Sequence, residues 1–231
     1  MYLKIYPTYY VMGFLSNRAR SKCCESVQFL LPVLEMALGR KQVLPKRKMA
    51  SVEEFFQLFP ELKDVFIDGT ERSVQKPKNI KKRNKLYSGK KKAHTRKTIV
   101  MSDDKKRVLA MSPTKSGRQH DKRLFDKAQM AYAIPKEVTI WTDTGFIGIQ
   151  HTHSNTVMLT KATKKTPLTD SQKQANRSIS SIRILSEHAI GGIKRLKSAT
   201  DIYRNRLPNI DDTFTLLAAG LWNLHLQKLT T

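Results

Sequence analysis

The clearest pattern of hydrophobic and polar positions lies in residues 176–197, where both kinds of position recur at helical spacing. At about 100° per residue the apolar positions form one stripe, as expected of a helix that packs on a core. Polar positions four and seven residues apart form a second face, within roughly 40° of one another. The sequence therefore predicts an amphipathic helix. Its apolar stripe consists of Ile182, Leu185, Ala189, Ile193 and Leu196, and its polar face of Arg183, Glu187 and Lys194.

The polar face of this helix has two interpretations. It can be exposed to solvent, with an ion pair between Arg183 and Glu187 that contributes about 0.3–0.5 kcal/mol. Alternatively, Glu187 is a metal ligand, and Arg183 and Lys194 hold a phosphate backbone beside it. The helix alone does not decide between them, so the other elements must.

Short apolar runs in the middle of the chain predict strands. The run at residues 65–67 predicts a buried strand that ends at Asp68 and Gly69. Because Asp-Gly is also a strong hairpin-turn signal, Asp68 could simply shape a turn. Two further strands are predicted at residues 87–101 and 107–113, joined by a charged hairpin turn.

A helix and a fourth strand complete this pattern. The helix is predicted at residues 121–128 and the strand at 138–141, followed by Asp143 in a glycine-bearing turn. Two predicted strands thus end in an aspartate. Because α/β sheets place their ligands at strand ends, we expect Asp68 and Asp143 to lie close together.

The N-terminal residues 1–50 predict a small helical unit. Its longest helix is expected at residues 21–38, where Pro32 should kink or divide it, and a shorter helix is expected within residues 10–20. This pair is compatible with a helix-turn-helix that reads DNA, and equally with an ordinary pair of packed helices. We expect a second domain over residues 51–231.

Charge narrows the class of partner. The 231 residues include 43 Lys+Arg and 19 Asp+Glu, and the formal net charge of +24 implies a polyanionic partner. No apolar run approaches the roughly 18 residues of a membrane span, so nucleic acid is favoured over a bilayer. The adjacent Cys23 and Cys24 are the only cysteines, which suits a reducing cytoplasm.

The most basic stretch of the chain lies between the two aspartates. Residues 72–102 contain 12 Lys/Arg and no acid. A charge run is often merely solvated, but one without acids beside an acidic strand end is better explained as a DNA track, since each neutralised phosphate releases counterions. The track includes Arg72, Lys76, Lys90, Lys91, Lys92, Arg96 and Lys97.

Five sequence blocks follow one another along the chain. They are FIDGTER at residues 66–72, YSGKKKAHT at 87–95, GRQHD at 117–121, WTDTGF at 141–146 and EHAIGGIKR at 187–195. Together, in this order, they resemble the blocks of bacterial insertion-sequence transposases of the DDE superfamily, and of the related Harbinger-type nucleases. The resemblance extends over about residues 6–226.

The resemblance implies an α/β, ribonuclease H-like fold: a mixed sheet flanked by helices, with a small N-terminal helical unit. By matching motif, its three acids are Asp68, Asp143 and Glu187. The family's glutamate helix carries a tyrosine, then two residues, an arginine, three residues, the glutamate, six residues and a lysine. Arg183, Glu187 and Lys194 fit this spacing, whereas Ser180 stands in the tyrosine place.

The same resemblance implies a metal-dependent DNA transposase that cleaves phosphodiester bonds at transposon ends and joins the 3′-hydroxyl to target DNA. Two Mg²⁺ or Mn²⁺ ions, held by the three acids and the scissile phosphate, suit this chemistry. The expected partner is double-stranded DNA, both at the element ends and at the target. A homodimer on DNA is compatible with the resemblance, and no membrane partner is expected. The location is bacterial, cytoplasmic and nucleoid-associated. The other expected DNA contacts are Arg183, Lys194, Arg195 and Arg204.

Two other functions remain open at this point. One is a catalytically inactive DNA-binding protein derived from a transposase, and the other is a basic RNA-binding structural protein. Among single residues, Asp121 is expected to cap a helix or support the site, and His151 and His153 to lie in a surface loop rather than bind zinc. The glycine pair at residues 191–192 implies that DNA or another backbone approaches closely, or that the helix breaks.

Overall fold

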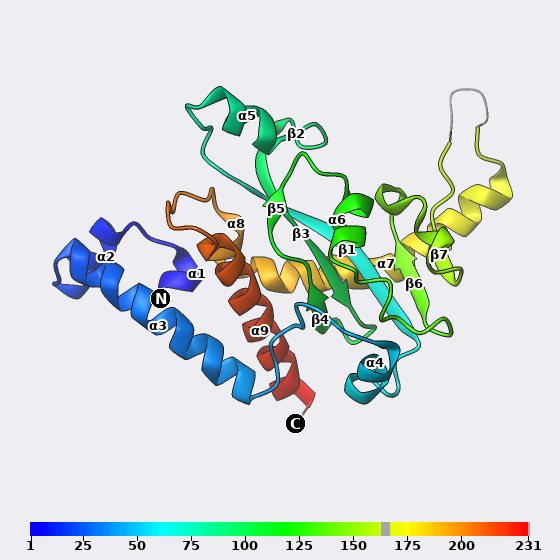
Figure 1. Cartoon of the computed structure of the whole chain (residues 1–231), viewed down its shortest axis with the longest axis horizontal. Coiled ribbons are helices and arrows are strands. Elements are labelled where there is room, and N and C mark those ends of the chain that lie inside the picture. The colour runs from blue at the N-terminus through cyan, green and yellow to red at the C-terminus, as the bar shows by residue number, and fades with distance from the viewer. Residues whose placement is uncertain (163–166, 231) are drawn as a thin grey trace.

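A mixed sheet of seven strands forms the centre of the molecule, with helices on both faces (Figure 1). The computed structural model describes residues 1–162 and 167–230, so residues 163–166 and 231 of the expected second domain lie outside the described residues. The expected α/β class, with a mixed sheet flanked by helices, is confirmed. The strands are β1 (Asp64–Ser73), β2 (Tyr87–Ser88), β3 (Ala93–Ser102), β4 (Val108–Met111), β5 (Lys115–Ser116), β6 (Thr139–Thr142) and β7 (Thr156–Met158).

The two halves of the sheet differ in strand direction. β1 is antiparallel to β3, and β2, β4 and β5 pair with β3 in the antiparallel sense. On the other side of β1, β6 and then β7 are parallel to it. The resulting order is β2-β3-β1-β6-β7, with β4 and β5 also on β3. β1 is therefore a central strand, bonded on both edges.

The prediction that the first strand ends at Asp68 and Gly69 is wrong. β1 continues to Ser73, and every residue from 66 to 73 has a partner on β3. Because β3 extends this far, the polar second half of β1 has its main-chain hydrogen bonds satisfied within the sheet. Asp68, opposite Val100, therefore lies within a strand and not in a turn.

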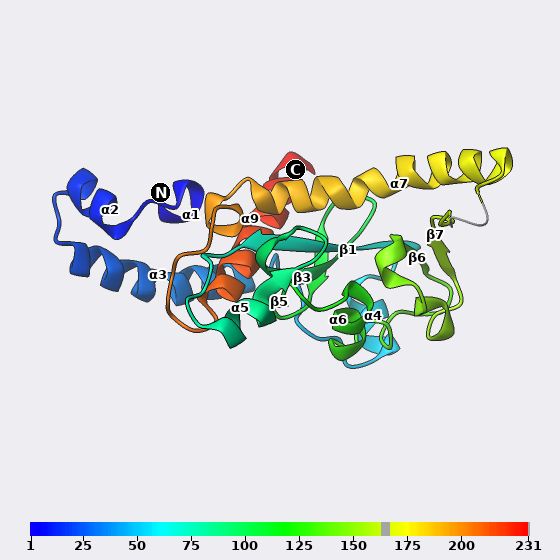
Figure 2. The ribbon, with the colours of Figure 1, turned by 90° about the horizontal axis from the view of Figure 1, so that it is seen from above.

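Side chains of the sheet alternate between two cores. Val65 and Ile67 of β1 pack in a core that includes residues of α4 (Val52–Leu58) and α6 (Asp121–Lys127). Val100 of β3 packs on the opposite face in a second core. That core includes residues of α7 (Asp170–Lys194), α8 (Lys197–Thr200) and α9 (Ile210–Thr230). Figure 2 shows α7 on one side of the sheet and α4 and α6 on the other.

The predicted amphipathic helix is present as part of α7, which begins at a capping box formed by Thr169 and Gln172. It continues without a break through its two glycines. A Cβ atom on Gly192 would lie 2.1 Å from a ring atom of Trp222 in α9, whereas Gly191 faces open space. The expectation that the helix breaks at the glycine pair is wrong, and the close neighbour of Gly192 is an aromatic side chain of the same protein.

The N-terminal helices are α1 (Tyr2–Ile5), α2 (Tyr9–Ser16) and α3 (Arg20–Arg40). Pro32 does not divide α3, which runs through it as one helix. Tyr6, Leu31 and Leu38 form a third core with Phe214 and Leu217 of α9. The N-terminal helices thus pack on the last helix of the chain. Among the helices of the described residues, none is both long and apolar enough to cross a membrane.

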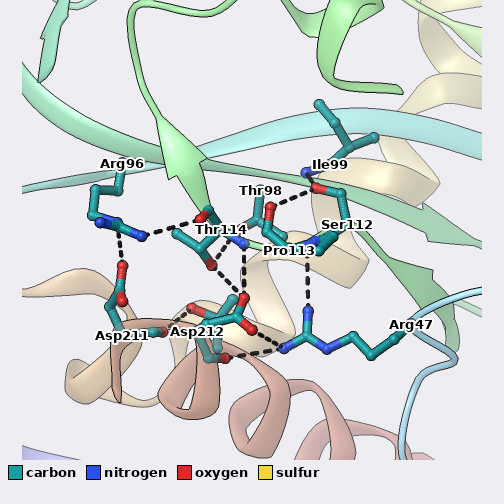
Figure 3. Close-up of polar contacts among 10 residues, drawn as sticks. Arg47, Arg96, Thr98, Ile99, Ser112, Pro113, Thr114, Asp211 and Asp212 are labelled. Carbon is teal, nitrogen blue, oxygen red and sulfur yellow. Dashed lines mark hydrogen bonds and ion pairs between the residues drawn. The ribbon is translucent and has the colours of Figure 1, made fainter. Parts of the chain in front are cut away.

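Two carboxylates at the start of α9 join it to distant segments (Figure 3). The Asp212 carboxylate accepts hydrogen bonds from the Thr114 amide at 2.7 Å and hydroxyl at 2.8 Å, and from the Arg47 guanidinium at 2.8 Å. Asp211 forms an ion pair with Arg96 of β3. These contacts fix α9 against the sheet and against the segment that leads from α3 to α4.

Candidate active site

Asp68 lies in the middle of β1, on the face that α7 covers. Burial raises the pKa of its carboxyl, and the negative charge of Asp143 raises it further. The Gly69 amide, which donates a hydrogen bond of 2.7 Å to the carboxylate, and the cations of Arg183 and Lys90 oppose this rise in pKa. The cations near the Asp68 carboxylate therefore do not offset its burial and its repulsion from Asp143.

Asp143 lies beside Asp68 because β1 and β6 are parallel neighbours. Ile67 and Thr142 are paired across the two strands, so the next residue on each is an aspartate. Asp143 caps a short 3₁₀ helix (Thr144–Phe146), and its Oδ1 atom accepts a hydrogen bond of 2.8 Å from the Gly145 amide. This pairing of strands agrees with the expectation that Asp68 and Asp143 lie close together.

Lys90 is the cation nearest to this pair of carboxylates among the ion pairs of the described residues. Its Nζ atom lies 3.7 Å from Oδ2 of Asp143, and its side chain is 63% exposed. The same charge also lowers the pKa of Asp68. A solvated lysine of this kind is a mobile counter-charge, so it does not fully neutralise the pair.

Glu187 lies exposed on α7, between two cations that face β1. Arg183, one helical turn earlier, acts on Asp68, and Lys194, seven residues later, lines the same small cavity as Thr70 of β1. The polar face predicted from the sequence therefore runs along the strand that carries Asp68. Within residues 1–162 and 167–230, however, no three acidic, histidine or cysteine side chains are grouped closely enough to hold a metal ion. The structure thus brings Asp68 and Asp143 together and leaves Glu187 apart from them.

A buried ionic cluster lies on the opposite face of the sheet, which α6 covers. The ammonium of Lys97 lies 2.6 Å from the Asp121 carboxylate and 3.2 Å from that of Glu71. It also donates a hydrogen bond of 3.1 Å to the Gln119 carbonyl. Burial alone would raise the pKa of Glu71, but a hydrogen bond from the Thr95 hydroxyl and the charge of Lys97 hold it below its usual value.

Asp121 connects this cluster to the pair of aspartates, Asp68 and Asp143. A Cβ atom on Gly69 would lie 3.1 Å from Asp121 Oδ1, and one on Gly145 would lie 2.9 Å from Asp121 Oδ2. Gly69 directly follows Asp68, and Gly145 is two residues after Asp143. The two glycines therefore let one carboxylate pack beneath both aspartates.

The model of the DDE superfamily endonuclease family matches residues 67–223, which contain all three acids and most of the sheet.

This chain belongs to the DDE superfamily of endonucleases.

A relative described as the probable transposase for insertion sequence element IS702, from Microchaete diplosiphon, is 29% identical over 226 residues. The alignment covers 97% of this chain and 77% of the relative. No solved structure matches the chain. The family expected from the five sequence blocks, insertion-sequence transposases of the DDE superfamily, is confirmed.

The expected DNA contacts of this DDE-superfamily chain fall into two groups. The first group is exposed to solvent and consists of Lys76, Lys90, Lys91, Lys92, Lys194 and Arg195. Arg183, which is half-buried and whose charge acts on Asp68, stands apart from both groups. The second group is bound to other parts of the protein. Its members are Arg72, Arg96, Lys97 and Arg204.

Arg72 and its neighbours show how the second group is bound within the protein. The guanidinium of Arg72, 7% exposed, lies 5.1 Å from the Tyr6 ring centroid and 5.0 Å from that of Tyr203. The guanidinium of Arg204 lies 4.1 Å from the same Tyr6 centroid. Arg96 pairs with Asp211, and Lys97 is 5% exposed in the cluster with Asp121. These cations have partners within the protein, and their contact with DNA stays a prediction.

The residues that sequence reasoning missed are the partners Glu71 and Lys97. A signal was available: Lys97, Ile99 and Met101 alternate along β3, and the last two belong to the α6-side core. A lysine on such an apolar face needs a buried acid, and Glu71 is its cross-strand partner in the register. The expectation that Asp121 supports the site fits its place in this cluster.

The two histidines expected in a surface loop are not alike. His153 is only 2% exposed, and its Nε2 atom lies 2.8 Å from the Val138 carbonyl oxygen. That half of the expectation is wrong, because the turn that leads into β7 packs back on β6. His151 is exposed, as expected.

The donor atoms at the catalytic pair fit a divalent cation of the Mg²⁺ class. They are carboxylate oxygens, the hard ligands that Mg²⁺ and Mn²⁺ prefer. The raised pKa of Asp68 reflects an electrostatic need that a cation would satisfy. Two protein carboxylates are also the number that Mg²⁺ usually takes, with water and substrate phosphate filling the other positions.

Proposed function

We propose that this protein is a DNA transposase that cuts the ends of its own mobile element and joins them to target DNA. The observation that carries the proposal is the pairing of Asp68 and Asp143 on neighbouring parallel strands, where burial and mutual repulsion raise the pKa of Asp68. The family supports a nuclease, and the name of the relative supports transposition. The strand order, three antiparallel strands followed by two parallel ones, supports a ribonuclease H-like fold.

On this proposal Asp68 and Asp143 hold divalent ions, and Glu187 completes the set. When bound, two such ions supply an activated water and stabilise the leaving oxygen of the phosphodiester. Glu187 is exposed on α7 one helical turn after Arg183, whose charge acts on Asp68, and the proposal requires the Glu187 side chain to move toward the pair when DNA and metal bind. The residues present therefore suffice for the ligand set that the motif implies.

The cations around the pair position the substrate. Arg183 faces Asp68, and Lys194 lies near Thr70 on the same face of β1, so phosphates on either side of the scissile one have a partner. In the first step, water attacks phosphorus and the bond to the 3′ oxygen breaks, which leaves a 3′-hydroxyl and a 5′-phosphate. In the second step, that hydroxyl attacks a target phosphate, and one ester bond replaces another without any oxidant or reductant.

The N-terminal residues 1–50 are assigned to DNA binding in this proposal, and residues 51–231 to catalysis. The turn between α2 and α3, at residues 17–19, is followed by a helix that begins with Arg20 and carries Lys22 in its first turn. These helices pack on α9, so DNA bound there would be held rigidly relative to the sheet. A homodimer on DNA and a location in the bacterial nucleoid belong to the same proposal.

Nicking of supercoiled plasmid in Mg²⁺ or Mn²⁺ at low salt tests the proposal. The wild-type protein should nick, and Asp143→Asn should not, while both bind the plasmid equally. Asp104→Asn is the matched control, since Asp104 is an exposed acid in the turn between β3 and β4. If wild type and both variants bind DNA and none nicks either plasmid or true element ends, the protein is the inactive DNA-binding derivative instead.

A further inference from the structure

A hollow lined by basic side chains lies between α5 (Ile80–Leu86) and α6, away from the cations on α7. Its volume is about 440 Å³, and it is open to solvent. The lining contains no acid. Its charged or titratable members are Lys81 and Lys85 of α5, Arg118 and His120 of the segment before α6, and Arg123 of α6.

The walls of this basic hollow are fixed by hydrogen bonds between segments far apart in sequence. The Ser116 hydroxyl of β5 donates to the Lys85 carbonyl, which attaches the end of α5 to the sheet. The Gln119 carbonyl accepts from Lys97, and the Gln119 amide donates to the Ser116 carbonyl at 3.1 Å. The backbone that carries the cations is therefore held in place before any ligand arrives.

The cations themselves lack counter-charges. Among the residues that the structure describes, none of the four permanent cations of the hollow forms an ion pair, although nine other lysines and arginines do. Their side chains are exposed and converge from three segments. A cleft lined by charges of one sign concentrates the potential and favours a bound anion.

The position of the hollow relates it to the catalytic pair. His120 lines the hollow, and the next residue, Asp121, packs beneath the glycines that follow Asp68 and Asp143. The hollow is therefore next in the chain to Asp121, the residue that packs against these glycines on the α6 side of the pair. Arg183 and Lys194 border the pair on the α7 side.

We propose that the basic hollow binds backbone phosphates of the DNA, so that DNA is held on both sides of Asp68 and Asp143. This inference rests on the proposed function and adds a binding site to it. Phosphodiesters are the anions that match several converging lysines and arginines, and a strand that crosses the pair would reach the hollow without leaving the protein surface. The contacts are independent of base sequence.

The salt dependence of DNA binding tests this site. Binding of a labelled duplex is measured in EDTA over a salt series for wild type and for the triple variant Lys85→Gln/Arg118→Gln/Arg123→Gln. The matched control is Lys63→Gln/Lys105→Gln/Lys136→Gln, which removes the same charge from exposed positions outside the N-terminal unit and away from the hollow. The hollow variant should lower the slope of log K against log salt by about two to three, because each phosphate contact contributes ~0.9.

For proteins that bind equally at 1 M salt, this difference in slope corresponds at 0.1 M salt to a loss of affinity on the order of a hundredfold to a thousandfold. The control triple should leave the slope within experimental error of wild type. Equal slopes for both triples would overturn the proposal, since net charge alone would then explain binding. Where the triple variant melts below wild type, the single variants Lys81→Gln and Arg118→Gln replace it, each with an expected slope change of ~0.9.

Titration with inorganic phosphate separates a DNA site from a site for a small anion. If wild type binds free phosphate, and the hollow variant loses that binding without any change in the DNA slope, the site takes a small anion and the DNA assignment is wrong. If wild type binds no DNA at all, the proposed function fails together with this site. Wild-type nicking with equal slopes would overturn the hollow alone.

Discussion

Lys97 and Asp121 form a buried ion pair with 2.6 Å between the ammonium nitrogen and a carboxylate oxygen, and their side chains are 6% and 9% exposed. Glu71, 5% exposed, shares the same ammonium at 3.2 Å. Two buried acids therefore depend on a single lysine, on the face of β1 opposite to Asp68. This cluster joins α6 to β1 and β3, and its Asp121 packs against Gly69 and Gly145, beside Asp68 and Asp143.

Replacing Lys97 by methionine should destabilise the fold strongly, because it leaves two uncompensated carboxylates facing each other in the core. Breaking a buried pair in this way costs about 3–5 kcal/mol. Urea unfolding of Lys97→Met at neutral pH measures the loss, with the exposed Lys105→Met as control. The difference should shrink as the pH falls and the two acids take up protons. A Lys97→Met protein as stable as wild type at neutral pH would show that the cluster contributes nothing.

The raised pKa of Asp68 predicts a pH dependence of stability in the absence of metal. An acid whose pKa is higher in the folded than in the unfolded protein stabilises the fold below its usual pKa, and this stabilisation is lost as the pH rises through the folded value. The loss should be absent from Asp68→Asn. In EDTA at neutral pH this variant should therefore melt above wild type, by ~2–4 °C for each kcal/mol gained.

The difference in melting temperature between Asp68→Asn and wild type should change sign when Mg²⁺ or Mn²⁺ is added. Metal that binds only the folded wild-type protein raises its melting temperature, and Asp68→Asn should lack this rise. Asp104→Asn should follow wild type in both conditions. If Asp68→Asn melts below wild type in EDTA at neutral pH, the carboxylate is not under electrostatic strain.

Adjacent glycines of α7 should respond in opposite ways to alanine. Gly191 faces open space, so Gly191→Ala should stabilise the helix by about 0.5–1 kcal/mol. A Cβ atom on Gly192 would lie 2.1 Å from the Trp222 ring, and the required shift should cost about 1–3 kcal/mol. Urea midpoints of the two single variants give the comparison, with each serving as the control for the other. Changes of the same sign would mean that α7 and α9 do not pack in this way.

The start of α9 should be sensitive at Asp212. Asp212→Ala leaves the Thr114 amide and the Arg47 guanidinium without their shared acceptor, and should cost about 2 kcal/mol. Asp170→Ala, at an exposed helix start, is the control and should cost a few tenths of a kcal/mol at most. Thermal unfolding compares the two. Equal small losses would show that the contacts in Figure 3 do not stabilise α9.

The sequence predicted most of the local structure because its signals are local. Apolar runs placed the strands, and the apolar stripe predicted at residues 176–197 packs on the core at Ala189 and Ile193, whereas Ile182 is exposed. The helix α5 was missed since its residues, IKKRNKL, are nearly all polar and it is held by contacts at its ends. No hydrophobic period indicates such a helix.

Sequence motifs predicted the acidic residues of the candidate site but not the surroundings of its charged side chains. Spacing identified Asp68 and Asp143, but the extension of β1 beyond Asp68 depends on β3, which is distant in sequence. The same limit applies to Arg72 and Arg96, whose charges are exposed or buried according to where Tyr6 and Asp211 lie in the fold. Composition counts charges and cannot tell which of them already have partners.

The two-sided use of β1 has a consequence for how copies of such an element decay. Successive residues of this strand serve catalysis and core in turn, so a codon gained or lost shortly before Asp68 would rotate the acid into the core and turn Ile67 outward. Such an allele loses the folded protein along with its activity. Genomic copies that still encode a folded but inactive DNA-binding protein should therefore carry single-base substitutions at the acidic codons, with the length of this strand unchanged.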